Sequence, residues 1–196
     1  MKILIDNGHS KATAGKRSPD RSFFEWKFNR EIAIPLVARL RELGYDAERI
    51  VTEDEHDVTL TERCNRVNKW CKKLGSKNVI FISIHANAAG SGDWKSARGF
   101  SVYVAKQCSD ASKKLAQSLY SEADKRGFRG NRSVPKEHYW QANFTVIAKT
   151  LCPAVLTENL SYDNKEDLAI LKSDEGKRKI VDLHVDGIIN YLNSLK

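Results

Sequence analysis

A chain of 196 residues is long enough to bury one hydrophobic core and short for two. Its 41% hydrophobic and 30% charged residues are typical of a soluble, globular protein rather than a disordered one. No apolar run approaches the roughly 20 residues that a membrane-spanning helix needs, so we expect no transmembrane segment.

The charge balance favours anionic partners without choosing among them. With 33 basic and 25 acidic residues, the chain carries a formal net charge of +8. Such a charge attracts polyanions, which include nucleic acid, anionic membranes and anionic cell-wall polymers. A purely solubilising role explains the same charge equally well.

Apolar runs typical of strands alternate with helical patterns along the chain. This alternation predicts an α/β fold in a single domain over residues 1–196, with a largely parallel, twisted sheet of about six strands and helices on both faces. The expected strands cover residues 2–6, 47–51, 79–84, 99–105, 144–148 and 154–157. The expected helices cover residues 25–43, 60–74 and 109–126 and a closing region from 164 to 195.

Local signals fix several of these boundaries. Pro35 lies inside the first helical pattern and predicts a kink or a late start there. Thr59 and Glu62 form a capping-box pattern at the start of the second helix, which Gly75 ends. Residues 127–143 are basic, aromatic and poorly periodic, so we expect a surface loop.

Three apolar strands run into polar groups of the kind that a metal site needs. The expected strand over residues 2–6 is followed by His9, the strand over 79–84 by His85 and the strand over 154–157 by Glu158. Sites in open parallel sheets form beyond the carboxyl ends of the strands, so these side chains can converge although they are far apart in sequence. Glu25 opens the first helix at the same edge and adds a second carboxylate.

Two imidazoles and one carboxylate suit a catalytic zinc, which keeps three protein ligands and one position for water. The bound ion lowers the pKa of that water toward neutrality. A carboxylate that does not bind the metal can then move the proton to a leaving amine. We interpret His9, Glu25 and His85 as the ligands and Glu158 as the proton carrier; Asp6 and Asn87 could orient the ligands.

Each residue taken alone also has a purely structural interpretation. His9 can be an ordinary loop histidine, and Glu25 can be an acid that favours the first turn of a helix. His85 and Glu158 end buried strands, where a polar group needs a partner or a function. The hypothesis therefore depends on the four residues as a set.

The sequence resembles the zinc-dependent N-acetylmuramoyl-L-alanine amidases of type 3, which cut peptidoglycan. The similarity lies in six stretches that follow the order of the family over nearly the whole chain: residues 3–9 (ILIDNGH), 25–29 (EWKFN), 60–63 (LTER), 81–87 (FISIHAN), 98–103 (RGFSVY) and 153–158 (PAVLTE). The resemblance implies one zinc ion on His9, Glu25 and His85, with Glu158 as the catalytic carboxylate. The implied reaction is hydrolysis of the amide between N-acetylmuramic acid and L-alanine.

Two stretches depart from the family pattern. The chain has Asp-Asn-Gly-His where the family usually has Asp-Pro-Gly-His, and Asn-Leu-Ser after Glu158 where Leu-Gly-Phe is usual. The second change alters the wall beside the catalytic acid and so affects substrate preference. Arg132 can contact a carboxylate of the stem peptide or be a solvated surface residue. His138 and its aromatic neighbours can line a substrate groove or pack the loop.

The resemblance also implies where the protein acts and with what. We expect peptidoglycan as the substrate, no nucleic acid partner and a monomer. The start of the chain shows no signal peptide, so we expect either a lysin made in the cytoplasm and released onto the wall, or a trimmed domain of an exported enzyme. The site of action is then the cell wall, which is periplasmic or extracellular.

Two alternatives remain open from the sequence. The first keeps the zinc and changes the substrate, which makes the protein a peptidase or deacylase on another small amide. The second is a basic module that binds wall polymer or nucleic acid without catalysis. The chain has no recognised nucleic-acid motif or concentrated basic helix in support of the second.

Overall fold

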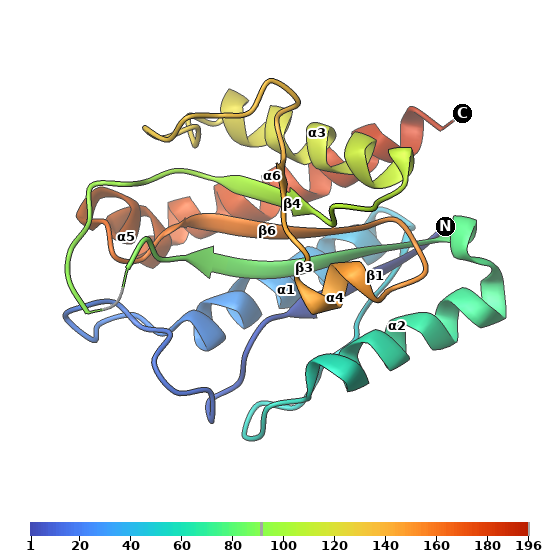
Figure 1. The fold of residues 1–196 in the computed structure, drawn as a ribbon, viewed down its shortest axis with the longest axis horizontal. Helices are drawn as coiled ribbons and strands as arrows, with labels where there is room; N and C mark the ends of the chain where they lie inside the picture. The colour runs from blue at the N-terminus through green and yellow to red at the C-terminus, as the bar shows by residue number, and fades with distance from the viewer. Residues whose placement is uncertain (91, 196) are drawn as a thin grey trace.

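The computed structural model describes residues 1–90 and 92–195, and its centre is a six-stranded sheet (Figure 1). The strand order is β2-β1-β3-β6-β4-β5, in which β4 runs antiparallel to β6 and the other pairs are parallel. The strands are β1 (Lys2–Asn7), β2 (Asp46–Arg49), β3 (Val79–Asn87), β4 (Ser101–Val104), β5 (Trp140–Gln141) and β6 (Ala154–Ser161). The predicted α/β fold with a largely parallel sheet is confirmed.

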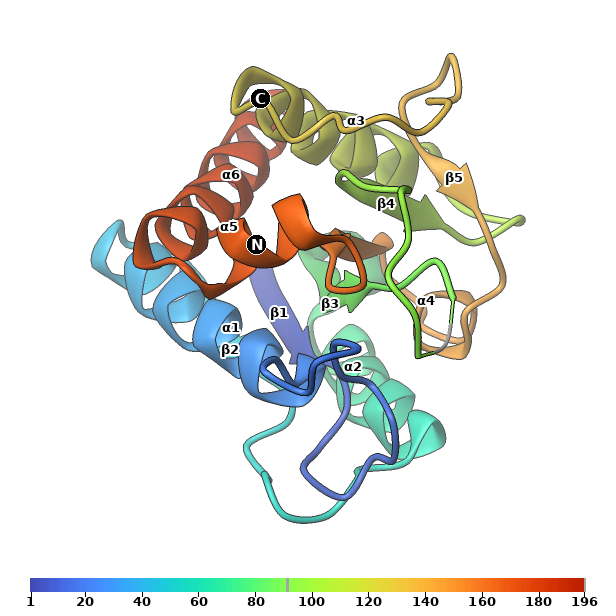
Figure 2. The same cartoon turned by 90° about the vertical axis from the view of Figure 1, so that its left-hand side faces the viewer.

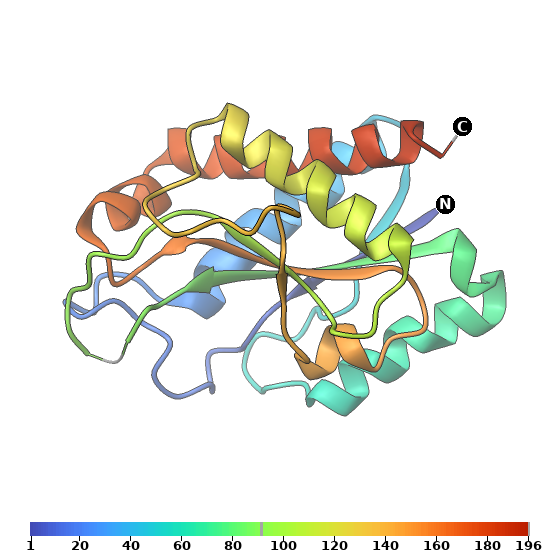
Figure 3. The same cartoon turned by 45° about the horizontal axis from the view of Figure 1, so that its top comes forward.

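Helices cover both faces of the sheet, as Figure 3 shows. One face carries α1 (Glu25–Glu42), α3 (Asp110–Lys125), α5 (Lys165–Lys172) and α6 (Asp174–Asn193). The other carries α2 (Leu60–Leu74) and α4 (Thr145–Ala148), with the short 3-10 helix η1 (Ser76–Asn78) after α2. Each layer buries its own apolar cluster against the sheet, so the central strands are covered from both sides.

The candidate site lies at the edge of the sheet where the carboxyl ends of three central strands meet. All six residues of β1 are buried, and Val79–Ile84 in β3 form an unbroken buried run, as expected for strands packed on both faces. Because β1, β3 and β6 are neighbours and parallel, their carboxyl ends meet at the same edge. Figure 2 looks onto that edge, with the long loop after β1 in front of it.

The two best-marked helices begin where the sequence predicts. In α2 the Thr59 hydroxyl accepts a hydrogen bond from the Glu62 amide at 3.2 Å, and Gly75 ends the helix with a φ of 85°. The helix α1 begins at Glu25 and runs unbroken through Pro35, so the predicted late start is wrong. Pro35 is exposed, which leaves the unpaired carbonyl of Glu31 on a side that water can reach.

Two further expectations need correction. Residues 144–148 form no strand; after Phe144 the chain turns into the short helix α4, which buries Val146 and Ile147 beside α2. So short an apolar run carries no period that separates a helix from a strand. The sixth strand is instead β5, which lies inside the predicted loop 127–143. The closing helical region is two helices, separated at Ser173, whose hydroxyl caps α6.

Candidate metal centre

His9 lies in a tight turn directly after β1. The Gly8 amide donates to the carbonyl of Ile84 at 3.1 Å, and His9 takes the left-handed conformation, with a φ of 62°. Two buried polar residues of α1 hold the turn in place: the Asn29 amide donates to the Gly8 carbonyl, and the Arg30 guanidinium to the His9 carbonyl, each at 3.0 Å. The helix therefore fixes the backbone that presents the His9 imidazole.

Glu25 is the first residue of α1 and is only 2% exposed. Its amide donates to the Lys16 carbonyl at 2.9 Å, which ties the start of the helix to the preceding loop. Its carboxylate oxygen Oε1 accepts from the amide of Ala86 at 3.3 Å and lies 3.0 Å from Nδ1 of His85. The same oxygen is 3.4 Å from Nε2 of His9.

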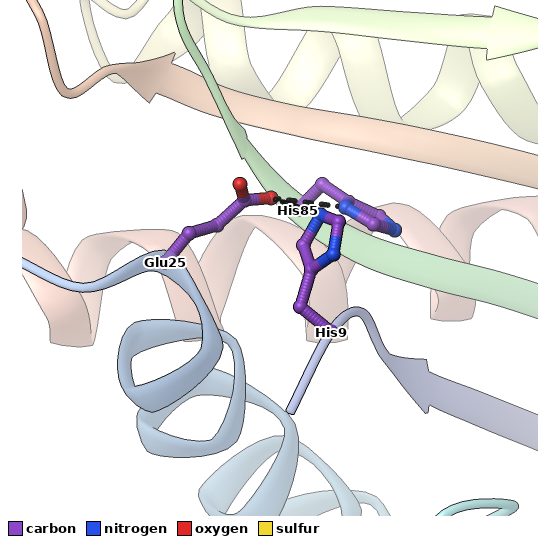
Figure 4. A group of neighbouring side chains, drawn as sticks. All are labelled: His9, Glu25 and His85. Carbon is purple, nitrogen blue, oxygen red and sulfur yellow. Dashed lines mark hydrogen bonds and ion pairs between the residues drawn. The ribbon is translucent and has the colours of Figure 1, made fainter. Parts of the chain in front are cut away.

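These three side chains converge from three separate elements (Figure 4). One ligand atom from each of His9, Glu25 and His85 can be chosen so that all lie within 4.8 Å of one another. The two imidazole rings meet edge to face, with their centroids 5.0 Å apart. The sequence prediction that these residues come together at the edge of the sheet is thus borne out by their positions.

Gly8 is required for this approach. A Cβ atom on Gly8 would lie 2.1 Å from Cε1 of His85, closer than any real contact allows. Only a residue without a side chain lets the turn after β1 pass over the imidazole on the next strand. Packing against His85 therefore explains the glycine of the Gly-His pair in the sequence.

Electrostatics favour a charged carboxylate in the group. Burial alone would raise the pKa of Glu25, but the hydrogen bonds and charges of His85 and His9 outweigh it and hold the pKa at about 2. The same contact with Glu25 raises the pKa of His85 against the opposing effect of burial. An anion that stays ionised beside two imidazoles is the donor set that a divalent cation needs.

The surroundings of the group leave room for a ligand. A cavity of about 430 Å³ opens beside it and is lined by His9, His85, Leu60, Phe144 and Val146 among others. His9 and His85 line this cavity, and the Glu25 carboxylate contacts both imidazoles without lining the cavity itself. Such a donor set fits a catalytic zinc, which keeps an open position toward the solvent. The residues present thus suit the metal that the sequence analysis expects.

Glu158 stands next to this group on the neighbouring strand. It is paired in register with His85 across the parallel strands β3 and β6. Loss of solvent around its carboxyl group, together with the charge of Glu25, raises its pKa to about 7 although His85, Lys16 and Arg132 act in the opposite direction. Its Oε2 atom is buried and has no hydrogen-bond partner within the described residues. A carboxyl group with these properties can bind and release a proton near neutral pH.

Asp6 and Asn87 do not make the ligand-orienting contacts that the sequence analysis predicts for them. Asp6 forms a buried ion pair with Arg63 and accepts from the Ser83 hydroxyl at 2.6 Å, so it contacts neither imidazole nitrogen. Asn87 accepts from the amide of Ala88. The His85 carbonyl is instead held by the side-chain amide of Asn159 at 2.9 Å.

Sequence reasoning missed Asn29, Arg30 and Asn159 as supports of the site. Asn29 and Arg30 are buried polar residues on α1, four and five positions after Glu25, on a helix whose buried face is otherwise mostly apolar. The position of these two polar residues on the buried face of the helix is the signal that sequence reasoning could have used. It shows that a polar residue belongs in the interior but not which carbonyl it binds, because the partner lies more than twenty residues away.

The sequence analysis left two roles open for Arg132 and two for His138, and the structure gives the contacts of both residues. The Arg132 guanidinium donates to the buried hydroxyl of Ser101 at 3.1 Å and lies over the Trp140 ring at 5.3 Å, beside the strand that faces Glu158. His138 stacks on Tyr120 of α3 with ring centroids 5.3 Å apart, which favours a packing role for it.

The fold and the three converging donors define an α/β protein with a candidate metal-binding group at the carboxyl edge of its sheet. The chain belongs to the N-acetylmuramoyl-L-alanine amidase family, whose profile matches residues 3–190. The family and the enzyme class predicted from the sequence are thereby confirmed.

Individual relatives agree with this assignment. The chain is 29% identical over 207 residues to the endolysin of Bacillus phage SPP1, a match that covers 99% of this chain and 67% of the endolysin. It is 27% identical to the catalytic domain of CwlV, an N-acetylmuramoyl-L-alanine amidase from Bacillus (Paenibacillus) polymyxa var. colistinus, with a TM-score of 0.79 over 98% of this chain and 99% of that domain.

A third comparison concerns the fold alone. The crystal structure of an N-acetylmuramoyl-L-alanine amidase from Clostridium difficile 630 superposes with a TM-score of 0.82 at 24% identity, over 100% of this chain and 98% of the other. Among residues 1–90 and 92–195, no helix is both long and apolar enough to span a bilayer.

Proposed function

We propose that this protein is a zinc-dependent peptidoglycan amidase that hydrolyses the bond between N-acetylmuramic acid and L-alanine. His9, Glu25 and His85 hold the ion and Glu158 handles the proton. The observation that carries the proposal is the convergence of two imidazoles and one carboxylate beside a solvent-accessible cavity. A zinc ion bound there supplies Lewis acidity toward the amide carbonyl and lowers the pKa of water.

The chain's own residues provide the remaining chemistry. Glu158, with a pKa of about 7, takes up a proton from the attacking water at its carboxylate and passes it to the nitrogen of the leaving L-alanine. Asn159 holds the backbone of His85, and Arg30 that of His9, so the two imidazoles keep their places during the reaction.

The relatives support the cell wall as the place of action. An endolysin and the catalytic domain of an amidase are both similar to this chain over nearly its full extent. The formal net charge of +8 suits an anionic wall polymer. We therefore propose peptidoglycan as the substrate and a lytic or remodelling role for the activity.

The experiment that tests this function is digestion of purified peptidoglycan, followed by mass spectrometry of the soluble products. An amidase releases stem peptides that begin with the free amino group of L-alanine and leaves intact lactyl groups on the glycan. Cuts between stem residues would show a peptidase instead. Lysis that persists undiminished after chelation of the metal would contradict the zinc requirement.

A further inference from the structure

Three fully buried polar side chains form a series of hydrogen bonds that ends at His85. They are His184 of α6 and Thr157 and Asn159 of β6, and each is 0% exposed. The Asn159 amide, which holds the His85 carbonyl, also donates to the Thr157 hydroxyl oxygen, and that hydroxyl lies 3.0 Å from Nε2 of His184. We call these three side chains the polar network. It joins the last helix of the fold to a proposed metal ligand.

The direction of the hydrogen bonds follows from the acceptor at the far end of the polar network. The Ile180 carbonyl, 2.8 Å from Nδ1 of His184, can only accept, so Nδ1 carries a hydrogen. Burial lowers the pKa of His184 to about 4, so at neutral pH the ring is uncharged and its Nε2 carries no hydrogen. Nε2 therefore accepts from the Thr157 hydroxyl. The competing acceptor for that hydroxyl, the Ser83 carbonyl, is farther away at 3.5 Å.

The orientation of Asn159 is fixed in the same way. Its amide donates to the Thr157 hydroxyl oxygen at 3.3 Å and to the His85 carbonyl at 2.9 Å, which uses both amide hydrogens. The reversed amide would place an oxygen against the His85 carbonyl, and two acceptors cannot form a hydrogen bond. In the observed orientation Oδ1 of Asn159 is buried without a partner among the described residues. The contact with His85 is thus made although another polar atom stays unsatisfied.

The polar network meets His85 where the sheet is irregular. The register between β3 and β6 shifts between His85 and Asn87, and Leu160 takes a left-handed conformation with a φ of 65°. That conformation is strained for a residue with a side chain and persists where the surrounding structure holds it. The Asn159 amide bridges β6 to β3 at this point, one residue before Leu160. The backbone of His85 is therefore held by a side chain at a place where the ladder is not regular.

We propose that Thr157 and His184 are positioning residues of the metal centre, which act through Asn159 to fix the backbone of His85 and with it the place of the imidazole. Their effect passes through the two hydrogens of the Asn159 amide, one on Thr157 and one on the His85 carbonyl. Fully buried hydrogen bonds that follow one another strengthen each other in a low dielectric. This inference rests on the proposed function, because it concerns residues that support the proposed ligand His85.

The first test measures the His85 carbonyl in chelated protein. Thr157→Val keeps the shape of the side chain and removes its hydroxyl, whereas Thr157→Ser keeps the hydroxyl and is the matched control. Labelling histidine carbonyl carbons and alanine amide nitrogens isolates one NMR signal, because His85 and Ala86 form the only His-Ala pair in the sequence. We expect this signal to move in Thr157→Val and to stay close to native in Thr157→Ser. An unmoved signal in Thr157→Val would overturn the polar network.

The second test measures zinc affinity by calorimetry. We expect Thr157→Val to weaken zinc binding about tenfold, as the loss of a contact that supports a ligand does, and Thr157→Ser to stay close to native. His184→Phe, which keeps a ring without its acceptor nitrogen, should weaken binding in the same direction; a native affinity in this variant would remove His184 from the proposal.

A double-substitution cycle decides whether Thr157 acts through Asn159. In an Asn159→Leu background the path to His85 is already cut, so Thr157→Val should cause no further loss of zinc affinity. Equal losses in the two backgrounds would overturn the proposal. If the native protein binds no zinc, the proposed metal function fails on its own, and the His85 carbonyl signal still decides whether the polar network holds the backbone of His85.

Discussion

His85 and Glu158 face each other directly across the paired strands β3 and β6, so a candidate metal ligand and a candidate proton carrier are held at neighbouring positions of one rigid sheet. The spacing of adjacent strands fixes how far apart their backbones lie. Neither residue depends on a flexible loop for its position. The arrangement separates two roles that can be tested one at a time.

The first prediction concerns Glu158. The substitution Glu158→Gln keeps the size of the side chain but removes its ability to take up a proton, so we expect the rate of peptidoglycan hydrolysis to fall by about 10²- to 10⁴-fold. Zinc content, measured by mass spectrometry of the purified protein, should stay at one ion per chain. Loss of the metal together with activity would show that Glu158 is a ligand rather than a proton carrier.

The second prediction concerns the metal. The proposed zinc site on His9, Glu25 and His85 predicts that zinc raises the melting temperature of the chelated native protein by roughly 5–10 °C at saturating metal. His85→Ala should abolish this rise, whereas His56→Ala, which changes an exposed histidine outside the group, should retain it. An unchanged rise in His85→Ala, read by differential scanning calorimetry, would contradict the proposed ligand set.

The third prediction concerns Gly8. In Gly8→Ala the added Cβ would overlap the His85 ring, so the imidazole must move away from Glu25. We expect zinc affinity to fall at least tenfold in a titration by calorimetry, because a displaced ligand loses its geometry. Gly15→Ala serves as the control, since its Cβ meets open space and costs only backbone strain. Equal affinities in the two variants would disprove the steric explanation.

The fourth prediction concerns the protonation of Glu158 in metal-free protein. Its folded pKa of about 7 lies above the ordinary value of 4.5, and the Arg132 charge opposes that rise. Arg132→Ala removes an attraction for the carboxylate and should raise the pKa further. Carbon-detected NMR of glutamate-labelled, chelated protein measures the titration directly. A pKa that stays fixed or moves downward in the variant would show that Arg132 does not act on Glu158.

The fifth prediction concerns His184, which is fully buried between Thr157 and the carbonyl of Ile180. Burial lowers its pKa from 6.5 to about 4. The unfolded chain therefore binds more protons than the folded one between these values, so stability is present above pH 6.5 and is lost as the pH falls toward 4. We expect a loss of up to about 3 kcal/mol in the free energy of unfolding from this group.

Chemical denaturation of the native protein and His184→Gln at several pH values checks this slope. The variant should lose the part of the pH dependence that lies between pH 6.5 and 4, whatever its absolute stability. His56→Gln is the control, because this histidine is exposed. Parallel curves for the native protein and His184→Gln would rule out the buried histidine as the cause.

The sequence by itself determined the type of the long elements and named the residues that converge at the candidate site. Apolar runs and helical periods mark β1, β3, β6, α1 and α2, because these patterns repeat over neighbouring residues. The polar residues that follow the strands stand out against those runs. The residues that end up adjacent, His9, Glu25 and His85, could be named because parallel strands share one carboxyl edge.

Only the tertiary structure decided which contacts hold that site and what surrounds it. The helical turn of α4, the strand β5 and the continuous helix through Pro35 follow from packing and solvent exposure that no local pattern records. The clash that makes Gly8 necessary and the cavity lined by Arg17 and Asp163 join segments far apart in the chain. The physical reason is that hydrophobic periodicity is a local property, whereas the distance between two side chains depends on how whole elements pack.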